Sequence, residues 1–118
     1  GAYSRLRQTI SDYAARCGAI RMVQPPAHWL IEKIGRFRID DCDPLAVAPM
    51  LGRPVLLIHG LADRHISPDH ARELAGAMDG QCQLWLIPKA AHLRCHDVAG
   101  RAYVERIDAF VRPHLAGQ

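Results

Sequence analysis

Two side chains suited to proton transfer lie in the second half of the chain. Asp63 occurs in the segment HGLADRHISP and His92 in the segment IPKAAH, each shortly after a run of apolar residues. A carboxylate that hydrogen-bonds one imidazole nitrogen fixes the tautomer of the ring, so the other nitrogen can act as a general base. We therefore predict that Asp63 and His92 form an acid–base pair.

Other histidines compete for this role. His96 lies four residues beyond His92 and is the alternative histidine if the register of the loop is shifted. His59 closes an apolar run in the dipeptide HG, which favours a packed or turn histidine over a base. The prediction keeps His92 first and His96 as its alternative.

A metal site is a second way to interpret the same region. Its potential ligands are His65, Asp69, His70, His92, Cys95 and His96. The spacing of His92, Cys95 and His96 superficially resembles that of metal ligands, but no arrangement reproduces a known zinc pattern. Cys95 is expected to be a free thiol and not a nucleophile. We predict no metal and no cofactor.

Two buried strands would position the acid–base pair. Residues 54–60 (PVLLIHG) and about 83–88 (QLWLIP) are continuous apolar runs, the pattern of strands buried on both faces of a parallel sheet. Ser67 and Pro68 begin a helix between them, and its apolar stripe of Ala71, Leu74, Ala75 and Met78 ends at Gly80. A right-handed crossover makes the strands parallel, so both loops leave the same edge of the sheet.

The remaining segments are predicted to be helical or irregular. Within residues 1–18, apolar spacing predicts a helix from about Ser4 to Cys17 that Gly18 ends. Residues 19–53 form a connecting or lid-like region with a short helix after two prolines and a helical turn after Pro44. The apolar residues of that short helix either line a pocket or pack on the sheet: Trp29, Leu30, Ile34 and Phe37. A last helix over residues 103–114 is expected to end near Pro113.

The order of these features resembles the last third of the α/β-hydrolase superfamily. The match runs from about Asp43 to Phe110: a strand PVLLIHG, an Asp three residues on, a Pro-started helix, a second strand and a P-x-x-x-H ending. It looks closest to serine aminopeptidases, prolyl-oligopeptidase-like domains and small esterases. The resemblance implies that Asp63 is the triad acid and His92 the triad histidine, in the family's chain order. It also implies an α/β fold, here incomplete, over residues 1–118, with residues 54–118 supplying strand, helix, strand and helix.

The nucleophile of that family is missing from the sequence. The family places it in a G-x-S-x-G turn upstream of the acid, and no such turn occurs here. Ser4 and Ser11 are expected in the opening helix and Ser67 at a helix start, so none is placed as a nucleophile. We expect this chain to be part of a longer serine hydrolase that cleaves small ester, thioester or peptide substrates, and to be inactive alone.

The composition bears on whether the chain binds nucleic acids or membranes and on the state of its cysteines. The net charge of +3 comes from 13 Arg and 2 Lys spread among 12 acids, and not from a basic block, so nucleic-acid or membrane binding is not predicted. No apolar run approaches the ~20 residues of a bilayer span. The cysteines Cys17, Cys42, Cys82 and Cys95 are widely spaced, which favours reduced thiols in the cytoplasm, with a two-disulfide secreted protein as the alternative.

A second hypothesis gives the chain no chemistry. A two-stranded sheet is marginal by itself, and an unpaired strand edge readily pairs with another chain. The chain would then be a non-catalytic remnant that forms a homo-oligomer or binds a partner through its exposed sheet edge. The mass in solution and an ester hydrolysis assay would separate the two hypotheses.

Overall fold

The computed structural model describes residues 3–16, 18 and 24–115. Its helices and strands follow the chain as α1 Leu6–Arg16, α2 Gln24–Gly35, η2 Ile39–Asp41, α3 Pro44–Val47, η3 Ala48–Leu51, β1 Val55–Gly60, α4 Pro68–Ala77, β2 Cys82–Ile87, α5 Cys95–Ala99 and α6 Arg101–Leu115. Helices and parallel strands alternate in the second half, so the chain is of the general α/β class.

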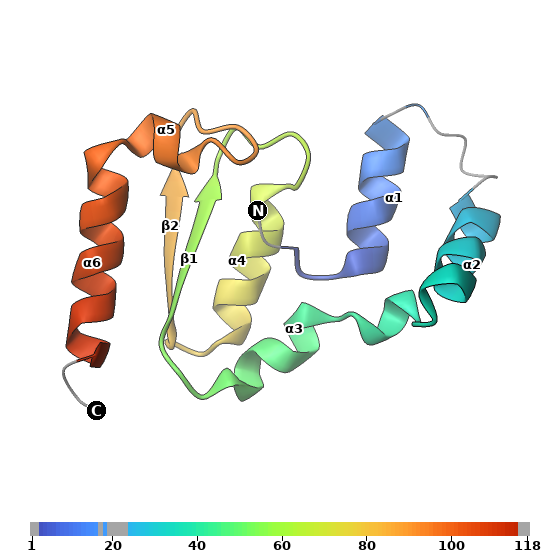
Figure 1. Cartoon of the computed structure of the whole chain (residues 1–118), viewed down its shortest axis with the longest axis horizontal. Coiled ribbons are helices and arrows are strands. Elements are labelled where there is room, and N and C mark those ends of the chain that lie inside the picture. Colours follow the sequence, from blue (N-terminus) through green and yellow to red (C-terminus); the bar gives the residue numbers. More distant parts are fainter. Residues whose placement is uncertain (1–2, 17, 19–23, 116–118) are drawn as a thin grey trace.

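The two strands pair in parallel, as the sequence predicts. The register runs from Val55 opposite Cys82 to Gly60 opposite Ile87. Both strands end at the same edge of the sheet, where α5 lies, and α4 connects them beside β1 (Figure 1). β1 begins one residue later than predicted, and β2 both begins and ends one residue earlier than predicted. This parallel pairing brings the loops after β1 and β2 together.

The helix between the strands carries the densest part of the core. Leu74 of α4 and Met78, which directly follows this helix, are buried against Ala48 of η3, and half-buried side chains of both strands complete the cluster. The N-terminal cap is the predicted one, since the Ser67 hydroxyl accepts a hydrogen bond from the Asp69 amide at 3.3 Å and Pro68 takes the first helical position. Burial of the predicted stripe and this cap explain why α4 begins and packs where it does.

The start of the chain differs from the prediction. Ser4 lies outside the first helix, which begins at Leu6. Its side chain is fully buried, and its hydroxyl donates to Glu73 Oε2 at 2.7 Å and lies 2.7 Å from His70 Nδ1. A buried hydroxyl requires partners, so this tertiary contact takes Ser4 out of the helix. Cys17, the predicted helix end, lies outside the described residues.

The helix in the connecting region also differs. α2 already begins at Gln24 and includes both prolines in its first turn, where a missing N–H leaves no hydrogen bond unmade. Phe37 lies beyond its end, because Arg36 has a positive φ of 53°. The side chains of Trp29 and Ile34 are 60% and 76% exposed. Figure 1 shows α2 far from the strands, so the alternative prediction that this helix packs on the sheet is wrong.

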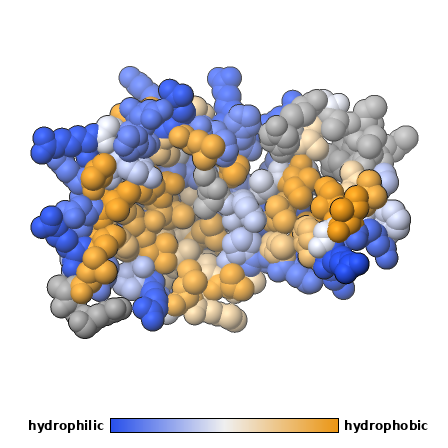
Figure 2. Space-filling view, viewed as in Figure 1, coloured by the Kyte–Doolittle hydropathy of each residue, from blue (hydrophilic) through white to orange (hydrophobic). Residues whose placement is uncertain are grey.

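Two corrections concern the end of the chain. The short helix α5 occupies Cys95–Ala99, where a loop was expected. Pro113 lies inside α6, which continues to Leu115, and does not end it. Pro113 removes one N–H bond, to the carbonyl four residues earlier, and only two residues follow it in the helix, so the loss is confined to the last turns of α6. Apolar side chains gather over the sheet and beside α6 (Figure 2).

Candidate active site at the ends of the strands

The loop after β1 holds the carboxylate of Asp63. Asp63 Oδ1 accepts hydrogen bonds from the backbone N–H groups of His65 at 2.8 Å and Ile66 at 3.0 Å. The side chain is only 2% exposed. The loop therefore wraps around its own carboxylate and fixes its direction before any other side chain contributes.

The loop after β2 brings His92 to the same carboxylate. His92 Nδ1 lies 2.9 Å from Asp63 Oδ2, and because an ionised carboxylate only accepts, Nδ1–H is the donor. The imidazole is 29% exposed. His92 therefore carries its free electron pair on Nε2, the atom that can take a proton. The structure thus brings together the two residues that the sequence singled out.

Hydrogen bonds keep Asp63 ionised in spite of its position. Burial acts to raise the pKa of the carboxyl group, but hydrogen bonds from the Ile66 backbone, the His92 side chain and the His65 backbone outweigh it. The net result is a pKa below the usual value of an aspartic acid.

Gly60 allows the two loops to meet. A Cβ atom at this position would lie 2.2 Å from the carbonyl oxygen of Ala90. The Ala90 carbonyl instead accepts a hydrogen bond from the Ala62 backbone at 3.0 Å, and Leu61 bonds Ile87 in the same way at 2.9 Å. The glycine is therefore required by the close approach of the loop that carries His92 to the end of β1.

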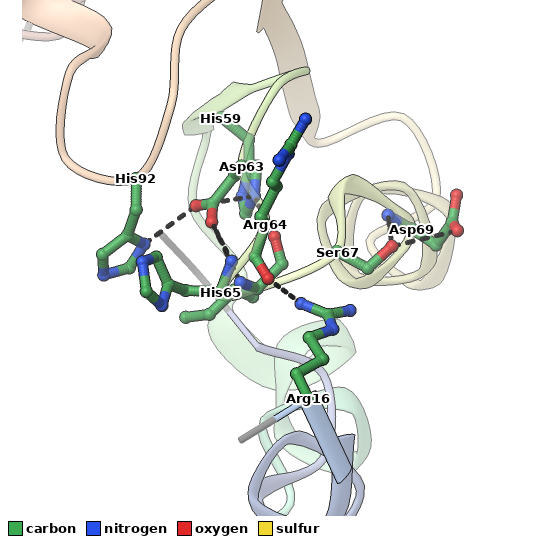
Figure 3. Close-up of polar contacts among 9 residues, drawn as sticks. Arg16, His59, Asp63, Arg64, His65, Ser67, Asp69 and His92 are labelled. Atoms are coloured by element: carbon green, nitrogen blue, oxygen red, sulfur yellow. Dashed lines mark hydrogen bonds and ion pairs between the residues drawn. The ribbon is translucent and has the colours of Figure 1, made fainter. Parts of the chain in front are cut away.

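A pocket lies beside His92. Thr9 and Ile10 of α1, His65 and Ile66 of the loop after β1, and His92 line a space of about 480 Å³. The ring of His65 lies beside that of His92 (Figure 3), and the two ring centroids are 5.1 Å apart. Thr9 directs its hydroxyl to the Arg5 carbonyl at 3.0 Å, so most of the wall is apolar. Sequence analysis missed this pocket because α1 is distant in the chain.

His96 and Cys95 lie outside the hydrogen-bonded pair. The His96 side chain is 64% exposed and lies 3.6 Å from Asp97, and its ring contacts Tyr103 edge-on. Burial, and to a lesser degree the charge of Asp63, raise the pKa of the Cys95 thiol, which disfavours the reactive thiolate. The geometry thus favours His92 over its alternative.

No serine lines the pocket in the part of the chain that the structure describes. Ser4 is buried in its contacts with α4, Ser67 caps that helix, and Ser11 lies on α1. Within the same residues, no group of three or more His, Cys, Asp or Glu side chains is arranged to hold a metal ion. Among the described residues, the site thus offers an oriented imidazole and a pocket, but no serine beside them.

Comparison of the chain with known protein families, with curated proteins and with solved structures found no match to any of them. No helix among the described residues has both the length and the apolar character needed to cross a bilayer. Because the comparisons found no match, the chemistry of the site has to be inferred from its own residues.

Proposed function

We propose that Asp63 and His92 are the acid and the general base of a hydrolase that cleaves ester, thioester or peptide bonds. The observation that carries this proposal is the 2.9 Å hydrogen bond between His92 Nδ1 and an Asp63 carboxylate that the backbone already holds. This is the arrangement by which a carboxylate orients an imidazole for proton transfer. The resemblance of the strand and loop sequence to the last third of α/β-hydrolases supports the same proposal.

The proposed reaction is acyl transfer to water. A serine hydroxyl from a segment outside this chain attacks the substrate carbonyl while His92 Nε2 takes its proton, and His92 then passes the proton to the leaving group. Water, deprotonated in the same way, hydrolyses the acyl-enzyme. Asp63 stays ionised throughout and stabilises the imidazolium. The lid-like role of residues 19–53 belongs to the same proposal.

The pocket supports an uncharged substrate group. Ile10 and Ile66 contribute apolar walls next to His92, and no Lys, Arg, Asp or Glu among the described residues lines the pocket. An acyl chain or an apolar side chain of a small molecule would lose water on entering it without leaving a charge unpaired. The site therefore fits a small ester or peptide better than a highly charged substrate.

The test is the hydrolysis of an activated ester, p-nitrophenyl acetate, by the chain itself. The serine-dependent turnover of the proposed enzyme should be absent from this chain. An oriented imidazole still attacks an activated ester, or activates water, slowly, so we expect a small rate above buffer whose largest part is lost in His92→Gln. Asp63→Asn should lower it on the order of tenfold or more, because Asn does not hold the required tautomer. His96→Gln is the matched control and should leave the rate unchanged. A rate insensitive to His92→Gln would contradict the proposal.

A second candidate function rests on the sheet. Among the described residues, β1 and β2 pair only with each other, so the outer edge of β1 offers unpaired backbone groups. A second copy or another protein could add a strand there, as the hypothesis of a non-catalytic remnant requires. A solution mass above that of one chain, combined with an ester rate insensitive to His92→Gln, would favour this candidate.

The thiols support a reducing compartment for the proposed enzyme. Cys42, Cys82 and Cys95 are free in the structure. Burial raises the pKa of the Cys82 thiol, and a hydrogen bond from the Leu57 backbone opposes this effect only in part. Unpaired cysteines of this kind fit the cytoplasm better than a secreted, disulfide-stabilised protein.

A further inference from the structure

His59 is the most enclosed titratable side chain near the candidate site. It precedes Gly60 at the end of β1, and its side chain has no exposed surface. Its Nε2 atom lies 3.1 Å from the Ile66 carbonyl oxygen and 3.5 Å from Asp63 Oδ2. Its Nδ1 atom is buried and finds no hydrogen-bond partner among the described residues. The two ring nitrogens therefore have opposite surroundings.

These surroundings decide where the proton lies. Both neighbours of Nε2 are acceptors, a carbonyl and an ionised carboxylate, so a hydrogen atom on Nε2 satisfies them. A hydrogen atom on Nδ1 would be a buried donor without an acceptor, which costs more than an unused lone pair. His59 therefore carries its hydrogen atom on Nε2, and Nε2–H donates to the Ile66 carbonyl oxygen.

Ile66 connects His59 to the candidate site in two ways. Its carbonyl accepts from His59, and its backbone N–H donates to Asp63 Oδ1 at 3.0 Å. Its side chain forms part of the pocket beside His92. Figure 3 shows Asp63 between His59 and His92. A donor on His59 thus fixes the residue that both holds the carboxylate and shapes the pocket wall.

We propose that His59 is a positioning residue: through Nε2–H it holds Ile66, and thereby the direction of the Asp63 carboxylate towards His92. The inference rests on the proposed function, because it assigns His59 to the acid–base pair of that site. His59 does not line the pocket and takes no proton in the reaction. The sequence pattern alone favoured a packing role, and the geometry adds a directional one.

Two substitutions separate the two ring nitrogens. The amide nitrogen of Gln reaches about the position of Nε2, whereas that of Asn reaches about the position of Nδ1, so His59→Gln keeps the donor and His59→Asn misplaces it. We expect hydrogen exchange of the Ile66 amide to accelerate on the order of tenfold in His59→Asn and much less in His59→Gln. The His92-dependent ester rate should fall by a similar factor in His59→Asn and stay close to the wild-type rate in His59→Gln.

Nitrogen chemical shifts of the wild-type chain supply a measurement that needs no variant. They should report His59 protonated at Nε2 and His92 protonated at Nδ1. An Nδ1-protonated His59, or equal Ile66 exchange in the two variants, would overturn the role of His59. These measurements do not require hydrolysis. If the ester rate is the same in His92→Gln as in wild type, but the exchange of the Ile66 amide differs between the two His59 variants as expected, the proposed function is contradicted. The link from His59 to Asp63 is then still supported.

Discussion

At the scale of single residues, one carboxylate organises the candidate site. Asp63 accepts from two backbone amides through Oδ1 and from His92 through Oδ2. Both oxygens of the carboxylate accept hydrogen bonds, so the group is held in one direction. This fixed direction distinguishes Asp63 from an ordinary loop-capping aspartate, which would bond its own backbone alone.

The lowered pKa of Asp63 has a consequence for stability. Because the folded pKa lies below the unfolded value of about 3.9, ionised Asp63 stabilises the fold above about pH 4, and this contribution is lost as the pH falls through the folded pKa. We expect the free energy of unfolding of the wild type to exceed that of Asp63→Asn most above about pH 5. The difference should shrink at lower pH.

Urea unfolding between about pH 3 and pH 7 measures this difference. Asp108→Asn removes an exposed carboxylate that pairs with Arg112 on α6 and serves as the matched control. If the difference in free energy of unfolding between wild type and Asp63→Asn stays constant down to about pH 3, the fold does not lower the pKa of Asp63, and this prediction is wrong.

At the scale of elements, the close contact between the end of β1 and the loop after β2 decides the site. The strands determine that both loops leave one edge, but not how near they come. Gly60 permits the contact with Ala90, and two backbone hydrogen bonds then join the loops. Lys89 and Leu93 adopt positive φ angles of 62° and 59°, so the loop around His92 turns sharply on both sides.

Gly60→Ala tests this contact. The new methyl group would overlap a backbone carbonyl, which cannot move away as a side chain does, so we expect a loss of about 1–3 kcal/mol in the free energy of unfolding. The His92-dependent ester rate should fall as well, because the loops separate.

Gly76→Ala is the control for this substitution. Gly76 lies within α4 with open space around it, and alanine there should raise stability by up to about 1 kcal/mol. Urea unfolding of both variants gives the comparison. A Gly60→Ala variant as stable as the wild type, with an unchanged ester rate, would mean that the close approach does not hold the loops together.

At the scale of the whole molecule, the helices α1 and α2 extend away from the sheet (Figure 1). The extents of the molecule along its principal axes are 50 × 31 × 23 Å. Arg7 ties α1 to the segment after α2 through Asp40, with bonds of 2.5 and 2.9 Å. The link to the sheet runs through Ser4, which bonds α4, and through Arg16, which donates to the Arg64 carbonyl. These few polar contacts position the α1 wall of the pocket.

Ser4→Ala tests that link. Without the hydroxyl, the buried His70 ring loses a hydrogen-bond partner, which should cost about 1–3 kcal/mol in the free energy of unfolding. Ser11→Ala, on α1, should instead gain a few tenths of a kcal/mol, roughly the difference in helix propensity. Urea unfolding followed by circular dichroism compares the two. Equal stabilities would mean that Ser4 does not anchor the N-terminal segment.

The sequence alone determined both strands and the helix between them, but not α5 or the end of α6. Continuous apolar runs predicted two parallel strands, and Ser67, Pro68 and the apolar stripe predicted α4, because these signals are local and repeat with the period of the element. Asp63 and His92 were identified because each follows a strand, and parallel strands end at one edge. That much needs no knowledge of long-range contacts.

Only the tertiary structure decided what these residues do to one another. The burial of Ser4, the α1 wall of the pocket and the bond from His59 to Ile66 depend on contacts between segments whose spacing carries no periodic signal. A histidine in HG is compatible with packing alone or with a directed hydrogen bond. The acceptors around its Nε2 atom distinguish the two, because a buried donor is stable only where the fold places an acceptor.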